Sequence, residues 1–409
     1  MVALILVPLG LGLLAGLGAN VGTYALSGVT GVSGTAAMLG FAVLYFGVMN
    51  DAGLFTPLIR GIVRVSGSDP RRLVVGTAMV AVMAHLDGSG ASTFLITIPA
   101  LLPVYDRLGL DRRVLACTVA LAAGTMNVVP WGGPTLRAAT SLQMDVGLVF
   151  RPLFPSLAVG IVGVLLIALW LGQSERRRLA QQTPAESSRS TDVMAASADG
   201  AQPPKILFGF NVLLTVTALA AMVFEWLPLP LVFMTAFAVA LVVNHRSPQA
   251  QRDQLAKHGS HAMLMVALIL AAGVFAGVTR ESGMLAAMAD ALVDILPDGV
   301  GPHLPLLMAV ASMPLSLVFD PDSFYFGVLP VIAAASDAVG TPGIEVARAA
   351  LLGQMTTGFP VSPLTPATFL LVGLSGVDLA AHQRRTIPLA FGVTLLMTLA
   401  AVATSAFRW

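Results

Sequence analysis

The sequence contains little charge and almost no cysteine. Asp, Glu, Lys and Arg make up 11% of its 409 residues, whereas a soluble protein carries about a quarter. Hydrophobic residues make up 56% and the mean hydropathy is +0.85, so the apolar runs need lipid as their solvent. The composition therefore predicts an all-α, polytopic membrane protein. The single cysteine, Cys117, excludes an internal disulfide and a Cys-rich metal site, and we interpret it as a packing residue.

Other absences exclude further classes of protein. The net charge of +1 gives no indication of nucleic-acid binding. The HExxH motif of intramembrane metalloproteases is missing, so we expect a protein that is not an enzyme. Met1 runs directly into apolar residues without a basic segment, so no cleavable signal peptide is expected.

Two short polar segments interrupt the apolar sequence. The first is His85–Thr93 (HLDGSGAST) and the second is Asp320–Ser323 (DPDS). Their flanks match, because Ser92 and Pro99 recur 231 residues later as a serine and a proline. Carboxylates and helix breakers at membrane depth are costly unless they line a site or cavity. Paired broken segments of this kind indicate the binding site of a transporter.

Hydropathy and charge predict the topology. Apolar spans are expected at about 2–18, 33–50, 153–172, 206–226, 228–245, 262–280 and 385–407, with interrupted spans at 112–142 and 345–376. We interpret 73–104 and 304–338 as re-entrant helical hairpins, which gives nine crossings. With the N-terminus inside and the C-terminus outside, 17 of the 22 Lys and Arg residues lie on the inner side. This asymmetry supports the crossing count.

The two halves form an expected inverted repeat. The first repeat covers 1–172 and the second covers 206–409, and the polar stretch 173–205 is interpreted as a disordered cytoplasmic linker. Five crossings separate the starts of the two units, and an odd number inverts the second relative to the first. The hairpins therefore enter from opposite faces, and their tips meet near the midplane.

The tips and breaks supply the candidate site. A broken helix leaves backbone N–H and C=O groups without helical partners. The N-terminus of a helix presents N–H groups and a positive dipole end, which suit a carboxylate ligand. Hydroxyl and amide partners are expected from Ser92, Thr93, Asn127, Thr135, Ser323, Ser362 and Thr365. Arg137 either clamps a carboxylate or anchors the outer face.

The acidic tip residues Asp87, Asp320 and Asp322 would repel an anion. They fit a ligand that arrives with a divalent cation, or they carry coupling protons or Na⁺. The alternative is that each only caps the second helix of its hairpin. His85 is a candidate proton carrier, although a hydrogen-bonded packing role is favoured.

Several strings resemble the metal-citrate:proton symporter family, which belongs to a larger class of ion transporters. They are YFGVMNDAGLF at 45–55, LDGSGASTFLITIPALLPVYDRLG at 86–109, NVVPWGGPTLRAAT at 127–140, SFYFGVLP at 323–330 and LVGLSGVDLAAHQR at 371–384. The resemblance covers nearly the whole chain outside 173–205.

The resemblance implies import of citrate as a chelate with Mg²⁺ or Ca²⁺, driven by protons, with no permanently bound cofactor. It also implies a homodimer in the cell membrane, with a scaffold and an elevator-like moving unit that holds both hairpins. The site residues implied in this way are Asp87, Gly88, Ser92, Thr93, Asn127, Gly132, Gly133, Thr135, Arg137, Asp322 and Ser323.

Two alternatives stay open on the residues alone. A Na⁺-coupled carrier of free di- or tricarboxylates would use the same Ser, Thr and Gly tips as a cation cage. A passive anion channel could also form from inverted hairpins, although titratable aspartates at both tips favour ion coupling. One arginine and three aspartates suit a singly charged metal chelate better than the free citrate trianion.

Overall fold

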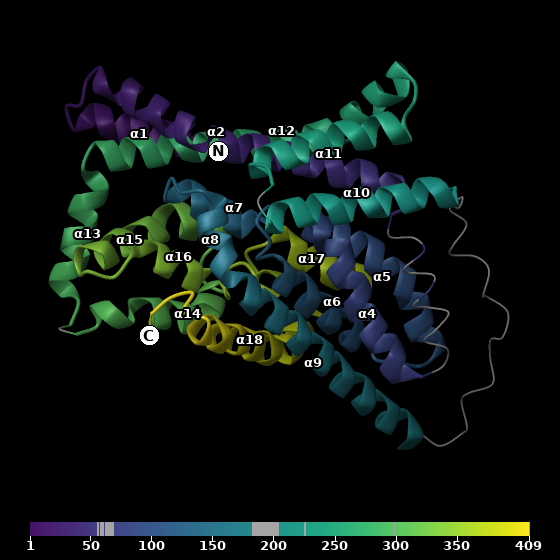
Figure 1. Ribbon diagram of the computed structural model, residues 1–409. Helices are drawn as coiled ribbons and strands as arrows, with labels where there is room; N and C mark the ends of the chain where they lie inside the picture. Colours follow the sequence, from purple (N-terminus) through teal and green to yellow (C-terminus); the bar gives the residue numbers. More distant parts are fainter. Residues whose placement is uncertain are drawn as a thin grey trace.

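The computed structural model describes residues 1–54, 57, 61, 69–181, 204–224, 226–297 and 299–408, and this part of the chain contains helices and no strands. Four helical segments are long and apolar enough to cross a membrane: α2 (Asn20–Asp51), the continuous stretch Val146–Gln181, α12 (Pro248–Glu281) and α18 (Leu379–Ala403). Shorter apolar helices accompany them (Figure 1). The prediction of an all-α membrane protein with several apolar spans is confirmed.

One layer of the molecule consists of α1 (Val2–Leu14), α2, α11 (Leu229–Asn244) and α12. In Figure 1 this layer lies along the top, with α10 (Lys205–Val223) below it. The helices α2 and α12 are in backbone contact, because a methyl group on Gly28 would overlap the carbonyl oxygen of Gly273 and lie 2.7 Å from Gly277 Cα. Glycine is therefore required for this close crossing.

The first hairpin joins α4 (Pro70–Ala84) to α5 (Gly90–Arg107) through a short 3₁₀ turn, His85–Asp87. Gly88 follows with a left-handed backbone (φ +70°), which a residue with a Cβ adopts only under strain. Ser89 then caps α5 by accepting a hydrogen bond from Ser92 N–H. These residues explain why the chain reverses here, within the expected 73–104.

The second hairpin joins α14 (Leu304–Leu315) to α15 (Leu329–Ala338), and its returning arm begins with a π-helical segment, Ser323–Val328. Its bounds match the expected 304–338. In Figure 1 the α4–α5 pair lies toward the right and the α14–α15 pair toward the left.

Both predicted helix breaks are present. The first separates α6 (Arg112–Met126) from α7 (Gly133–Ser141), and the second separates α16 (Gly343–Ala350) from α17 (Pro366–Ser375). The second break contains one 3₁₀ turn, Phe359–Val361. Proline stands in the first turn of α7 and of α17, where its missing N–H has no helical partner to lose.

The remaining elements complete the chain between these features. They are α8 (Val146–Phe150), the 3₁₀ turn Arg151–Leu153, α9 (Phe154–Gln181), α13 (Met284–Ile295) and the 3₁₀ turn Gly301–His303. In Figure 1, α13 runs along the left edge of the molecule beside α15.

Several helices are longer than hydropathy predicted. The helix α2 begins at Asn20 rather than near 33, and α12 begins at Pro248 rather than near 262. Gly, Ser and Thr or charged residues lower the hydropathy of these added turns, yet their backbone remains helical. The helix α9 extends to Gln181, so the first part of the expected linker 173–205 is helical, and 182–203 lie outside the described residues.

Candidate functional site

A cavity of about 520 Å³ lies between the hairpin tips, the two helix breaks and the helices α2 and α12. The first half contributes tip residues Asp87–Ala91 and residues around the first break. The second half contributes Pro321 of its tip and residues of the second break and the start of α17. The opposite wall comes from α2 and α12 and is apolar except for one histidine. That wall consists of Leu39, Val43, His261, Met265, Leu268 and Ile269.

The cavity includes some of the expected site residues and excludes others. Those that line it are Asp87, Gly88, Asn127, Gly133, Arg137 and Thr365. The other expected residues lie behind this lining or beside it: His85, Ser92, Thr93, Gly132, Thr135, Asp320, Asp322, Ser323 and Ser362.

Several expected hydroxyl ligands are already engaged by the backbone. Thr135 Oγ1 donates to Val128 O at 2.8 Å, and Thr365 Oγ1 donates to Phe359 O at 2.9 Å. Ser362 Oγ accepts from Leu364 N–H at 3.2 Å. These bonds satisfy carbonyl and amide groups that the breaks leave unpaired, so the three side chains stabilise the breaks.

Arg137 reaches from α7 to the second hairpin. Its Nε donates to Asp322 Oδ1 at 2.7 Å, and its side chain is only 16% exposed. Because Nε holds this carboxylate, the terminal guanidinium nitrogens remain for the cavity that Arg137 lines. The arrangement presents a partly buried cation to an incoming carboxylate.

The three tip aspartates occupy different environments. Asp87 Oδ1 accepts from Ser89 N–H at 2.8 Å and also lines the cavity. Asp320 accepts from the N–H groups of Asp322 and Ser323 and from the Ser323 hydroxyl, which makes it the cap of the returning arm. Asp322 instead pairs with Arg137, so only Asp87 presents a carboxylate among the cavity-lining residues of the described chain.

His85 is fully buried and connects the first tip to both breaks. Its Nδ1 lies 2.8 Å from Thr93 Oγ1, and its Nε2 lies 3.3 Å from Asn127 Oδ1. Asn127 Nδ2 in turn donates to Met355 O at 2.7 Å. A continuous chain of hydrogen bonds therefore runs from the first hairpin through the first break to the second.

The neighbours of His85 present acceptor atoms to both ring nitrogens. Thr93 Oγ1 donates its own proton to Ser89 O at 2.8 Å, and the amide of Asn127 turns its oxygen toward the ring. A neutral imidazole carries one N–H and satisfies one acceptor, whereas an imidazolium carries two and satisfies both. Both ring nitrogens of His85 therefore lie beside acceptor atoms in a fully buried setting.

Three helix N-termini converge on the cavity. The first residues of α5, α7 and α17 are Gly90, Gly133 and Pro366, and all three line it. Each helix therefore directs its positive dipole end toward this space. The combination suits a ligand with several carboxylates.

Trp131 is the main site residue that sequence analysis missed. Its Nε1 donates to Leu86 O at 2.7 Å, and its ring stacks on Phe46 of α2 with centroids 5.8 Å apart. Its position between Pro130 and Gly132 offered a signal, because a tryptophan buried in a break needs a partner for its N–H. The ring fixes the tip of the first hairpin against the first break.

Comparison with known proteins adds to this geometry. Residues 1–353 match the CitMHS family, described as citrate transporter. A protein of Bacillus subtilis (strain 168) named citrate transporter is 45% identical over 404 residues, covering 98% of this chain and 93% of the relative. A second protein of the same organism, named Mg(2+)/citrate complex secondary transporter, is 37% identical over 397 residues, covering 97% of this chain and 91% of the relative.

A solved structure has a similar fold. The crystal structure of the YdaH transporter of Alcanivorax borkumensis aligns with a TM-score of 0.68, covering 92% of this chain and 87% of that chain. The sequence identity is 16%, so the likeness concerns the fold alone.

Proposed function

Because the chain belongs to the CitMHS citrate transporter family, we propose that it imports citrate as a complex with a divalent metal, coupled to protons. It is a multi-pass membrane protein and a secondary citrate transporter, not an enzyme. The relative named Mg(2+)/citrate complex secondary transporter supports a metal–citrate complex as the substrate.

One observation carries the proposal: the cavity presents a cation and a carboxylate together. Arg137 and Asp87 both line it, and Arg137 is already balanced by Asp322. A free citrate trianion would meet Asp87 with no second cation among the lining residues to offset the repulsion. A chelate with Mg²⁺ or Ca²⁺ carries one negative charge, so its carboxylates can face Arg137 and the helix N-termini while its metal faces Asp87.

Exchange of partners on Arg137 provides a route to coupling. A cargo carboxylate that engages the guanidinium competes with Asp322 for the same positive charge. Protonation of Asp322, or of His85 behind the cavity, would favour loading and would be reversed on release. With two protons the complex would carry a net +1, and a potential of about 100 mV, inside negative, would then supply roughly 2.3 kcal/mol per cycle.

We propose that the transport step is elevator-like. The hairpins and breaks would move as one unit against the layer of α1, α2, α11 and α12, which would act as the scaffold and hold a second copy of the chain. The positions of the hairpins at opposite ends of Figure 1 support two inverted repeats. In this proposal the N-terminus lies inside and the C-terminus outside. The apolar cavity wall from α2 and α12 would allow the polar site to slide past without forming bonds.

The test is labelled citrate uptake into proteoliposomes under an imposed proton gradient, with Mg²⁺, Ca²⁺ or EDTA. Uptake that requires the metal and stops with EDTA is the expected result. Uptake that ignores EDTA would overturn chelate transport, and uptake driven only by a Na⁺ gradient would favour the Na⁺-coupled alternative. Current that persists without either gradient would favour a channel.

A further inference from the structure

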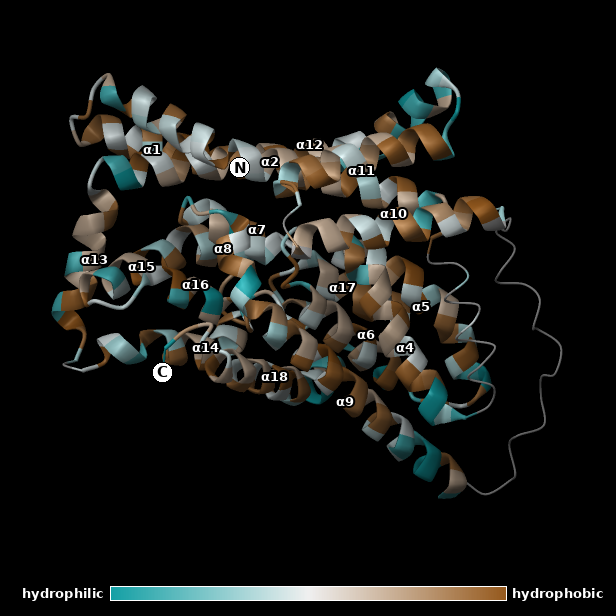
Figure 2. Cartoon of the chain, in the orientation of Figure 1, coloured by the Kyte–Doolittle hydropathy of each residue, from teal (hydrophilic) through white to brown (hydrophobic). Residues whose placement is uncertain are grey.

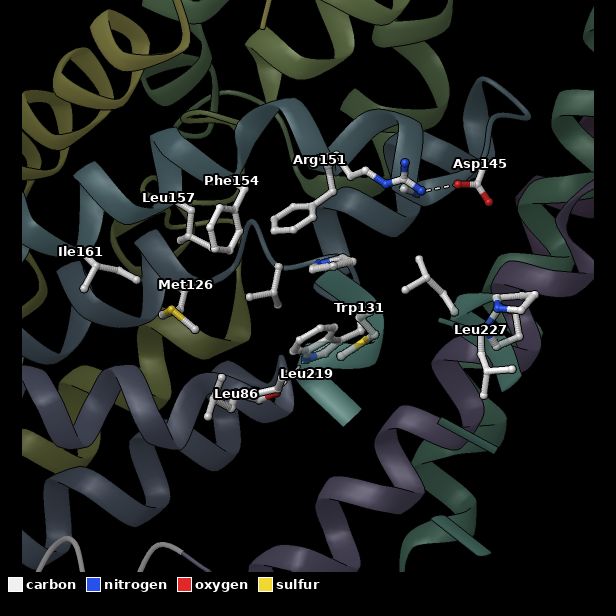
Figure 3. A pocket seen from close by; sticks show the side chains of 18 residues that line it. Leu86, Met126, Trp131, Asp145, Arg151, Phe154, Leu157, Ile161, Leu219 and Leu227 are labelled. Atoms are coloured by element: carbon white, nitrogen blue, oxygen red, sulfur yellow. Dashed lines mark hydrogen bonds between the residues drawn. The ribbon is translucent and has the colours of Figure 1, made fainter. Parts of the chain in front are cut away.

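A second cavity, of about 660 Å³, lies on the other side of Trp131 from the candidate citrate site. One wall comes from the first break and from the segment α8–α9, and the other comes from α10 and the start of α11 (Figure 3). Trp131 lines both cavities. The two spaces therefore share a wall.

The lining of the second cavity is almost wholly apolar. Met126, Phe154, Leu157 and Ile161 face Leu219 across the space (Figure 3). The charged lining residues are Asp145 and Arg151, whose side chains point toward each other at one end of the cavity in Figure 3. A mostly apolar cavity of this kind suits an apolar guest better than water, because water would have few polar partners there.

The rim of this cavity continues the bilayer-facing surface. Phe154 and Leu227 line the cavity and are still 49% and 45% exposed. Nearby, Leu213 of α10 and Trp226 are 64% and 62% exposed, and Figure 2 shows brown, apolar turns along α10 with paler and polar turns between them. In a membrane such exposed apolar side chains suit contact with lipid tails, and this favours hydrocarbon as the medium at the mouth of the cavity.

We propose that this cavity is a lipid site, occupied by an acyl chain of a membrane phospholipid that enters from the bilayer. The occupant follows from the position of the cavity: its mouth opens on hydrocarbon and its walls offer only apolar contacts beyond the one charged pair. Filling it restores the dispersion contacts that an empty cavity forfeits.

The lipid site would act on the transport site through a short path. The chain would contact Leu86 and Trp131, whose hydrogen bond holds the tip of the first hairpin. An occupied cavity would therefore support the wall behind Asp87, which is the next residue along the tip. This role goes beyond citrate transport and does not depend on which metal or ion is carried.

The test uses the full chain in detergent-free nanodiscs that contain a phosphatidylcholine with a diazirine near the end of one acyl chain. After illumination, mass spectrometry of the digested protein locates the label. We expect it to be concentrated on peptides carrying Met126, Trp131, Leu157 and Leu219. Label spread evenly over the exposed faces of α9, α10 and α12 would overturn the proposal.

Matched variants sharpen the result. Leu219→Trp fills the cavity, whereas Leu213→Trp adds the same ring to the same helix on its lipid-facing side. Loss of the label from the cavity peptides is expected in Leu219→Trp and not in Leu213→Trp. If Leu219→Trp does not fold, Ile161→Phe narrows the cavity from α9 and gives the same test. Undiminished labelling in a folded variant that fills the cavity would refute the lipid site.

Discussion

Arg137 and Asp322 are 185 residues apart in the chain and form an ion pair in which Nε and Oδ1 lie 2.7 Å apart. The pair joins the helix after the first break to the tip of the second hairpin. Two elements from different halves therefore share one charged contact at the edge of the candidate citrate cavity. Any ligand that binds the guanidinium changes the link between the halves.

Asp322→Asn tests this exchange. The amide oxygen can still accept the Arg137 hydrogen bond, but the side chain can no longer carry a charge or take up a proton. We expect gradient-driven accumulation of citrate to be abolished while the protein folds normally and counterflow exchange persists. The control is Asp290→Asn, which removes an exposed carboxylate from α13. Accumulation equal to wild type would remove Asp322 from the coupling step.

His85→Gln tests the proton assigned to the buried imidazole. Glutamine can still donate to one of the two acceptors that Thr93 and Asn127 present, as a neutral imidazole does, but it cannot hold an additional proton. We expect citrate binding to survive and the dependence of uptake on the proton gradient to weaken. The measurement is the accumulation of citrate at a fixed substrate concentration over a series of imposed proton gradients. His303→Gln, at an exposed turn before α14, should leave the series unchanged. An unaltered gradient dependence in His85→Gln would assign the histidine to packing alone.

Gly133→Ala tests the position of the guanidinium. The added methyl group would lie 2.9 Å from Arg137 Nη1, at the flexible end of a side chain, so the guanidinium must move while the backbone stays. We expect KM for citrate to rise about tenfold, as for the loss of one hydrogen bond to a charged group, with an unchanged melting temperature. Gly373→Ala is the matched control, because no atom lies within 4 Å of its added methyl group.

Trp131→Phe removes one hydrogen bond and keeps most of the aromatic contact with Phe46 and Phe233. Leu86 O would lose its indole donor in a largely buried setting, which costs about 1–3 kcal/mol. We therefore expect a lower melting temperature and faster proteolysis within the tip of the first hairpin. Trp226→Phe, at a ring that is 62% exposed, should change neither measurement.

Gly28→Ala tests the contact between α2 and α12. The methyl group would overlap the backbone of Gly273, which cannot move aside as a flexible side chain would. Separation of the helices should destabilise the protein by about 1–3 kcal/mol. Gly22→Ala, earlier on the same helix with open space around it, provides the control in a thermal unfolding series. Equal melting temperatures in the two variants would contradict the packing described here.

The sequence predicted the hairpins and the breaks because proline, glycine and aspartate act through local rules. Gly88 needs a left-handed backbone and Asp320 caps the helix that follows it, and neither effect depends on distant residues. The starts of α2 and α12 were missed because small and polar residues lower hydropathy without ending a helix.

The site was only partly predictable, for a different reason. Asp320 and Asp322 are the same type of residue two positions apart, so the sequence alone does not distinguish their roles. Only the three-dimensional fold shows that Asp322 contacts Arg137. The wall from α2 and α12, including His261, consists of residues that look like ordinary membrane-span residues. Their role depends on which helix packs over the tips, and spacing along one chain does not contain that information.

The hydrogen bond from Asn127 to the Met355 carbonyl has a consequence for how the cargo leaves. It ties the two breaks directly to each other, between two residues that line the cavity. A mechanism that separated the two halves would have to break this buried hydrogen bond in every transport cycle. We therefore expect the two halves to stay in contact throughout the cycle. The site, with its cargo bound, would then move as one unit until it faces the solution on the other side of the membrane.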